Sequence, residues 1–325
     1  MITEFCGVDV SKDWFDAAFV SEKAKRYDND PQGWEKFVNE VLSRGGQVQV
    51  TLEHTGGYEL GLAKACHGAG ITVCLVDGGK IANYRRSFGR AKAKTDEVDA
   101  VLIARFSSER KLRVWTPLPE EFQTLRELVR YREDLLEEKT SWSFRLVGRT
   151  ISAFTRQQIQ AQLKFLETQL KKLHLEIAKV LQESPTLRRA HELLVSIPGI
   201  ATLTAAKILA ESGPIQNYKS ARQYALAAGL CPIVRHSGKW TPRGRLPKYG
   251  NVALRTCFYF PVVCAIRCKN SVFPHYDKVR EKPGNEKMTG VVAAMRKLAH
   301  IVYGVLKNDT LYDPNKPFQK NSGKA

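Results

Sequence analysis

Four acidic side chains limit the folds that this chain can adopt. Asp9 and Glu53 each end an apolar run typical of a buried strand, and Asp96 and Asp99 lie three residues apart at the start of a predicted helix. A carboxylate at the end of an apolar strand is costly to bury unless another group neutralises it. Two strand ends and one helical face can bring four carboxylates together. Two divalent metal ions about 4 Å apart would then relieve their repulsion and would clamp the attacking and leaving oxygens of a phosphodiester.

Residues 1–118 alternate the patterns of strands and helices. We expect a hairpin of strands at 5–10 and 14–20, a helix at 33–43, a strand at 47–53, a helix at 58–70, a strand at 71–76 and a helix at 96–110. A hairpin followed by strand–helix units predicts an α/β domain with a mixed sheet. Open sheets bind ligands at the carboxyl ends of their strands, where Asp9 and Glu53 stand. Asp13 and Asp16 belong to the hairpin and are expected to be solvated.

Residues 119–183 have a helical composition, rich in Glu, Lys, Gln and Leu and poor in Gly and Pro. From Ile159 to Val180, apolar residues recur at alternating steps of four and three, which is a heptad seam. We favour a coiled coil that joins two protomers through this seam. The alternative is an internal hairpin in which the seam packs against residues 122–146.

Residues 184–312 are predicted to be mostly helical and to contact nucleic acid, and 313–325 to form a mobile tail. The run from Leu194 to Ile200, followed by residues 204–211, resembles a helix–hairpin–helix, in which the turn at Gly199 would offer backbone N–H groups to a phosphate. The acid-free segment 233–250 breaks the helical periodicity and is predicted to grip a phosphate backbone. Its basic residues are Arg235, Lys239, Arg243, Arg245 and Lys248.

Charge predicts a polyanionic partner. The net charge is +18, and residues 231–325 alone hold 18 Lys and Arg against 5 Asp and Glu. This asymmetry favours nucleic-acid binding dominated by phosphate neutralisation. The basic segment 84–90 also holds aromatic residues, which could stack on RNA bases or could pack locally. Its candidate contacts with nucleic acid are Arg85, Arg86 and Arg90.

The seven cysteines form no C-x-x-C pair and suit a reducing cytoplasm. We expect no membrane span.

Several short motifs in order resemble a known family. The segments 7–12, 52–58 and 94–100 look like the three acidic motifs of the Piv/MooV-type DEDD transposases. The C-terminal half is also similar to that family, in segments 197–200, 228–232, 236–238, 248–251 and 295–299. The resemblance extends from about residue 5 to about residue 306, and its specificity lies in the order and spacing of the motifs.

The resemblance implies a fold and an activity. Members of this family are bacterial insertion-sequence recombinases with a RuvC-like, RNase H-like N-terminal domain and a C-terminal transposase domain, which the residues predict to be joined by a central coiled coil and to be mostly helical at the C-terminal end. By analogy, Asp9, Glu53, Asp96 and Asp99 would hold Mg²⁺, as two ions, with Mn²⁺ as a substitute. Ser237 would attack the DNA backbone and form a phosphoserine link. A structured non-coding guide RNA would pair with target and donor DNA, and dimers would assemble into a tetramer near the nucleoid.

The predicted role of Ser237 depends on this resemblance more than the predicted roles of the four acids do. A serine hydroxyl is a weak nucleophile without activation, and no Ser-His-Asp spacing is visible. His236 is adjacent, and adjacent side chains rarely face each other. Two other functions therefore stay open. One is a RuvC-like nuclease or junction resolvase that uses water, and the other is a non-catalytic RNA-binding or DNA-architectural protein.

Overall fold

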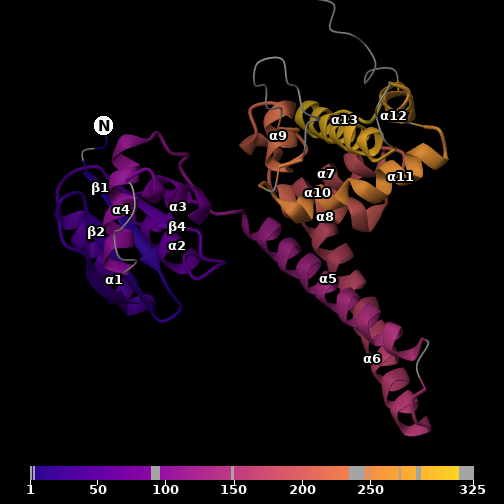
Figure 1. Cartoon of the computed structure of the whole chain (residues 1–325), viewed down its shortest axis with the longest axis horizontal. Helices are drawn as coiled ribbons and strands as arrows, with labels where there is room; N and C mark the ends of the chain where they lie inside the picture. The colour runs from indigo at the N-terminus through magenta and orange to yellow at the C-terminus, as the bar shows by residue number, and fades with distance from the viewer. Residues whose placement is uncertain are drawn as a thin grey trace, which may run out of the picture. The chain divides into compact units, whose positions relative to one another are not determined.

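The structure of the chain is a computed structural model with two compact units, Met1–Pro117 and Leu118–Ala325 (Figure 1). It describes residues 2, 4–88, 96–147, 150–233, 246–247, 249–270, 272–282 and 287–314, and it leaves the side chains of 96–98 out. The predicted regions 119–183 and 184–312 therefore fall within one compact unit.

The first unit is built on a five-stranded mixed sheet with strand order β3-β2-β1-β4-β5. The strands are β1 (Glu4–Val10), β2 (Trp14–Phe19), β3 (Lys25–Asp28), β4 (Val48–Glu53) and β5 (Thr72–Val76). β1, β2 and β3 pair antiparallel, whereas β4 runs parallel to both β1 and β5. The predicted α/β fold of this region is confirmed, and the short strand β3 was not predicted.

Helices cover both faces of this sheet. α1 (Pro31–Ser43) and α2 (Leu60–Gly68) share one apolar cluster with side chains of β1 and β4. α1 begins two residues before the predicted start at residue 33, because Asp30 caps it and Pro31 suits the first helical position. α4 (Asp96–Glu109) packs against β1, β2 and β4 on the opposite face, since its Ser107 contacts alternate β4 residues that point away from the first cluster.

The second unit is helical, as predicted. Its helices are α5 (Glu120–Leu146), α6 (Ala153–Glu183), α7 (Pro185–Val195), α8 (Thr202–Ser212), α9 (Ala221–Ala227), α10 (Val252–Cys257), α11 (Tyr259–Arg267), α12 (Phe273–Arg280) and α13 (Lys287–Asn308), with a short 3₁₀ helix at Ile215–Asn217. α13 is a central helix of the apolar core. Within the described residues it is also the helix long and apolar enough to cross a membrane, but half of that stretch is buried inside the unit.

α5 and α6 run side by side as a long helical hairpin (Figure 1). The predicted heptad seam lies on the inner face of α6, where Leu166, Leu173 and Ile177 are buried in the same cluster as Phe122 and Leu125 of α5. The structure therefore describes the internal hairpin, the second of the two interpretations of the seam. Contact between protomers stays a prediction, and it would have to use another face of the hairpin.

Candidate active site

Two of the predicted acids project from neighbouring strand ends. β1 and β4 are parallel and pair Val8 with Leu52, so the next residues, Asp9 and Glu53, are neighbours near the C-terminal ends of adjacent strands. Glu53 is the last residue of β4, and Val10 follows Asp9 in β1. Val8 and Leu52 are fully buried in the cluster with α1 and α2. Because side chains alternate along a strand, both carboxylates point to the opposite face, which α4 covers. Both acids are half-buried.

Gly7 sets the position of α4. A Cβ atom on Gly7 would lie 2.1 Å from the backbone N of Ala104 and 2.3 Å from the backbone O of Ala100. Only glycine therefore lets α4 lie this close to β1. The contact puts the helical turn that contains Asp99 over the face from which Asp9 projects.

Asp99 is buried, with 6% of its surface exposed, and it forms an ion pair with Arg85 of α3 (Gly78–Arg86). A buried carboxylate requires such a counter-charge, because desolvation of an unpaired charge is costly. The predicted contact of Arg85 with nucleic acid stays a prediction, and it would require release of this ion pair.

Glu53 lies against the start of α3. A Cβ atom on Gly78, the first residue of that helix, would lie 2.3 Å from Glu53 Oε1. The helix begins there because the Asp77 side chain accepts a hydrogen bond from Gly79 N at 2.9 Å. The positive end of a helix dipole favours a carboxylate at this position. Glycine at position 78 therefore helps to fix the place of Glu53.

A buried acid that sequence reasoning missed organises the loop after Glu53. Glu59 is fully buried and accepts hydrogen bonds from the backbone N of Thr55 at 3.3 Å and of Gly57 at 2.9 Å. Its other oxygen lies 3.0 Å from His54 Nδ1. Gly56 and Gly57 adopt positive φ angles of 81° and 124°, which glycine permits. Two consecutive glycines directly after a candidate acid were the sequence signal for such a constrained turn.

Asp16 corrects one expectation. It is 2% exposed and pairs in register with Asp9, so it is buried rather than solvated. Arg26 neutralises it with two hydrogen bonds, of 3.0 Å and 2.8 Å. Asp13 is exposed, as expected. Asp16 therefore has an arginine partner of its own on the face of the sheet that carries Asp9.

The donor chemistry of this face fits a hard divalent cation, because Asp9, Glu53 and Asp99 all offer carboxylate oxygens. The described side chains nevertheless include no group of three or more His, Cys, Asp or Glu placed to hold one metal ion. Asp99 is engaged by Arg85, and the side chain of Asp96 lies outside the described set. Metal binding by all four acids would therefore require Asp99 to exchange its arginine for the ion.

The remaining predicted contacts are distributed over both units. Arg86 is exposed on α3 and donates a hydrogen bond to Asn83 at 3.3 Å. Gly199 is exposed in the turn between α7 and α8 with a φ of 94°, and a Cβ there would lie 3.0 Å from the carbonyl of Pro261. The other candidates lie outside the described residues: Arg90, Arg235, Ser237, Lys239, Arg243, Arg245 and Lys248.

Comparison with known proteins decides the family. Residues 6–150 match the model of the IS110-type DEDD transposases, and residues 191–277 match the transposase model of the IS116/IS110/IS902 family. The chain belongs to the IS110 family of DEDD transposases. The predicted resemblance is thus confirmed, and this IS110-family chain is an enzyme that acts on DNA.

Curated relatives agree with this family. The IS110-family chain is 26% identical over 331 residues to the pilin gene-inverting protein of Moraxella bovis, which covers 98% of this chain and 99% of that protein. It is 25% identical to the transposase for insertion sequence element IS1111A of Coxiella burnetii, over 77% of this chain and 74% of that protein. A solved structure, T. thermophilus RuvC in complex with a Holliday junction substrate, matches with 15% identity and a TM-score of 0.28, over 35% of this chain and 99% of that one.

Proposed function

We propose that this transposase exchanges DNA strands through a covalent link to Ser237, with Asp9, Glu53, Asp96 and Asp99 holding Mg²⁺. The observation that carries the proposal is the placement of three of these acids at one face of the sheet. Asp9 and Glu53 lie near the C-terminal ends of adjacent parallel strands on the face that α4 covers, and Gly7 lets the turn with Asp99 lie on the same face. Metal ions bound there, as Mg²⁺ or Mn²⁺, would polarise a phosphate and make a hydroxyl a better nucleophile.

The covalent step conserves phosphoester bonds. The Ser237 hydroxyl loses its proton as its oxygen attacks a DNA phosphorus atom, and one P–O bond of the DNA backbone breaks. The released sugar oxygen takes up a proton. A hydroxyl of another strand then loses its proton and attacks the phosphorus atom of the phosphoserine. The bond from phosphorus to the seryl oxygen breaks and that oxygen takes up a proton, so rejoining needs no high-energy cofactor. A nuclease that uses water would instead lose this bond to hydrolysis.

Nucleic-acid binding belongs to the basic second unit in this proposal. Net charge, the turn at Gly199 and the acid-free segment 233–250 support contact with DNA phosphates. The family resemblance adds a structured guide RNA that pairs with target and donor DNA, and dimers that close into a tetramer in the bacterial cytoplasm, near the nucleoid. The exposed face of the α5–α6 hairpin is available for such assembly, with Phe165 54% and Leu175 73% exposed.

Denaturing electrophoresis tests the covalent step. Wild-type protein, labelled nicked DNA, the guide RNA and Mg²⁺ should give a protein band that carries DNA. Ser237→Ala should bind DNA and RNA normally and give neither this band nor recombinants, whereas Ser43→Ala, at an exposed serine of α1, should behave as wild type.

Each rival function gives a different result in this experiment. Strand cleavage by Ser237→Ala without a covalent band would indicate a nuclease that uses water. A chain that binds nucleic acid but cleaves none with Mg²⁺ or Mn²⁺ would be an architectural protein. Recombination after complete digestion of RNA would remove the guide from the proposal.

A further inference from the structure

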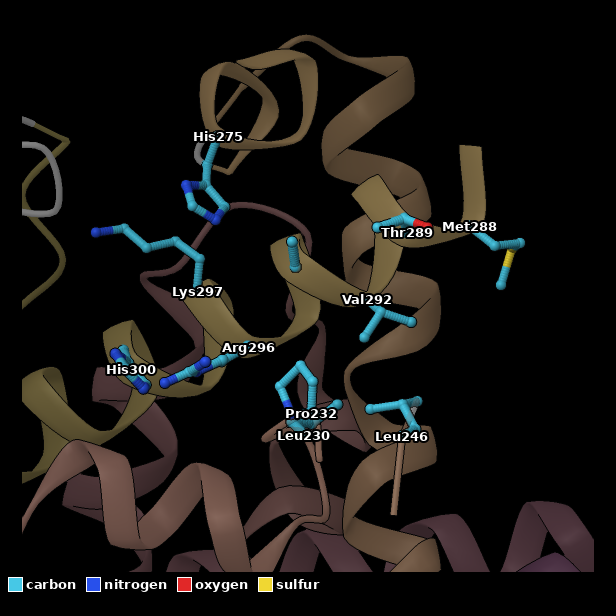
Figure 2. Close-up of a pocket in the computed structure, with 11 residues that line it drawn as sticks. Leu230, Pro232, Leu246, His275, Met288, Thr289, Val292, Arg296, Lys297 and His300 are labelled. Atoms are coloured by element: carbon cyan, nitrogen blue, oxygen red, sulfur yellow. The ribbon is translucent and has the colours of Figure 1, made fainter. Parts of the chain in front are cut away.

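A cavity of about 510 Å³ lies in the second unit between α12, α13 and the chain around residues 230–232 and 246 (Figure 2). Its volume is within the range of roughly 300–1,000 Å³ that is usual for small-molecule sites. None of the candidate site residues described above is among its described lining residues. Its two walls differ in chemistry.

One wall is apolar. Leu230, Pro232, Leu246 and Val292 present aliphatic surface to the cavity, and Thr289 stands at the same side (Figure 2). Aliphatic and ring surfaces of this kind can lie against the face of a nucleobase, as in proteins that hold a nucleotide outside its helix.

The other wall is basic. His275 of α12 and Arg296, Lys297 and His300 of α13 line it, and no acidic side chain is among the described lining residues. Burial lowers the pKa of His275, Lys297 and His300, and the neighbouring cations lower those of the two histidines further. His300 Nε2 is buried and makes no hydrogen bond within the described part of the chain. An anion would relieve this crowding of cations and could accept a hydrogen bond from His300.

Two lining residues of the cavity flank, in sequence, the segment that contains Ser237. Pro232 precedes that segment and Leu246 follows it, and both line the cavity. Two residues that bracket the proposed nucleophile in sequence therefore meet at one site. A ligand in this cavity would contact the chain on both sides of the segment.

We infer that this cavity holds one unpaired nucleotide of the DNA strand on which the enzyme acts, with its base against the apolar wall and its phosphate at the basic wall. Charge complementarity favours a phosphate, and the apolar wall distinguishes the site from a plain phosphate-binding surface. DNA is the expected source because the site adjoins both ends of the Ser237 segment. The inference rests on the proposed function, since it assumes that DNA lies beside Ser237.

Binding of short duplexes to full-length Ser237→Ala protein tests the site without any covalent step. Three DNA probes are compared: fully paired, with one unpaired adenine, and with one unpaired abasic nucleotide. The unpaired adenine should bind roughly tenfold more tightly than either of the others, because base contacts of this kind are worth on that order. Equal affinity for the adenine and abasic probes would overturn the assignment of a base to the apolar wall.

Filling the cavity should remove this preference. Val292→Trp should bind all three probes alike, and Thr289→Trp, at an exposed lining residue that cannot disturb the core, should do the same. Val252→Trp places the same bulk at an exposed valine of α10 and should keep the preference. On the basic wall, Lys297→Gln should weaken binding of the adenine probe. Lys307→Gln, at an exposed lysine farther along α13, should leave that binding unchanged. A preference that survives both cavity-filling variants would overturn the inference.

A matched RNA duplex with one unpaired adenine identifies the source of the nucleotide. Tighter binding of this RNA than of the DNA probe, lost on filling the cavity, would assign the site to RNA and overturn the assignment to DNA. Covalent adducts of wild-type protein are scored separately. An adduct in wild type together with a DNA preference that Val292→Trp and Thr289→Trp leave unchanged would remove this inference and keep the proposed function.

Discussion

The two units of this chain differ sharply in charge. Met1–Pro117 holds 17 Lys and Arg against 16 Asp and Glu and has a net charge of +1, whereas Leu118–Ala325 holds 34 against 17 and has a net charge of +17. A site for cations loses affinity in a strongly positive field, and a surface for phosphates loses affinity beside carboxylates. Under the proposed function, this separation would let each unit keep the electrostatic field that its ligand requires.

Arginines pair with acids in both units, but the second unit also gathers basic residues at one cavity. In the first, they neutralise acids of the same unit: Arg26 pairs with Asp16, Arg44 with Glu22, and Arg85 with Asp99. In the second, Arg130 pairs with Glu211 and Arg189 with Asp309. The second unit also has the basic wall formed by His275, Arg296, Lys297 and His300, which lines a cavity without an acid among its described lining residues. Five experiments can break or sharpen this contrast, from the largest expected effect to the smallest.

Removing one carboxylate of the first unit should stop chemistry and leave binding intact. Asp9→Asn keeps the size of the side chain, and strand exchange should fall by about 10³-fold or more because metal-assisted charge stabilisation is lost. DNA and RNA affinity should stay unchanged, since the second unit supplies it. Asp13→Asn, at an exposed acid nearby, is the control. Equal loss of binding and exchange would mean that the two functions are not separated.

A charge in the hairpin seam should destabilise the second unit. Leu173→Asp places a carboxylate in the interface of α5 and α6, and unfolding in denaturant should show a loss of about 3–5 kcal/mol. Leu175→Asp, at a residue 73% exposed, should change stability by less than about 0.5 kcal/mol. If light scattering shows that Leu175→Asp lowers the oligomeric mass, the exposed face joins protomers. An unchanged mass would leave assembly to other surfaces.

Close packing requires glycine at position 7 of the first unit but does not require it at position 304 of the second. Gly7→Ala drives α4 from β1 and should cost about 3 kcal/mol of stability together with most strand-exchange activity. At Gly304 of α13, no described atom lies within 4 Å of the place that a Cβ would take. Gly304→Ala should therefore stabilise the chain by about 0.5–1 kcal/mol. Thermal unfolding of both variants measures the difference. A mild effect at Gly7 would show that α4 can shift without harm.

The ion pair of Arg85 and Asp99 should compete with metal. Arg85→Gln leaves a buried carboxylate without its partner and should cost about 1–2 kcal/mol, discounted because Arg85 is 26% exposed. Added Mg²⁺ should raise the melting temperature of this variant more than that of wild type, since the ion meets no competing arginine. Arg86→Gln, on the exposed side of α3, should respond as wild type does. An identical Mg²⁺ response in all three proteins would exclude Asp99 from the metal site.

Mild acid should weaken the second unit slightly. Burial lowers the pKa of His174, His191, His275 and His300 below their ordinary value of 6.5. The unfolded chain then binds protons more readily than the folded chain, so stability is complete above about pH 6.5 and falls as the pH drops below it. The melting temperature should therefore be lower at about pH 5.5 than at about pH 7.5. His191→Gln should reduce this difference, and an unchanged pH dependence would remove His191 from its cause.

Sequence reasoning succeeded where a pattern is local. The apolar runs before Asp9 and Glu53 became β1 and β4, and the predicted helix at 33–43 became α1, two residues longer. β3 was missed because it has four residues, three of them charged, and forms a strand only through its pairing with β2. Tertiary pairing overrode a weak local preference there.

Contacts between distant residues explain the other differences. Asp16 looked like a hairpin surface residue, but Arg26 on the next strand allows its burial. The heptad seam of α6 indicated that a partner helix exists without identifying which one, and α5 fills that role. The basic segment around Arg85 gave no sign of the buried acid that Arg85 pairs with, Asp99. Contact of Arg85 with nucleic acid stays a prediction.

The sequence by itself determined which residues lie at strand ends, which faces of the helices are apolar and in which half the positive charge accumulates, because each is a local or additive property of the chain. Tertiary structure alone decided that α4 rests on Gly7, that Glu53 lies against Gly78, and that a cavity joins both ends of the Ser237 segment. These features depend on distances between elements far apart along the chain, and the packing of whole elements sets such distances.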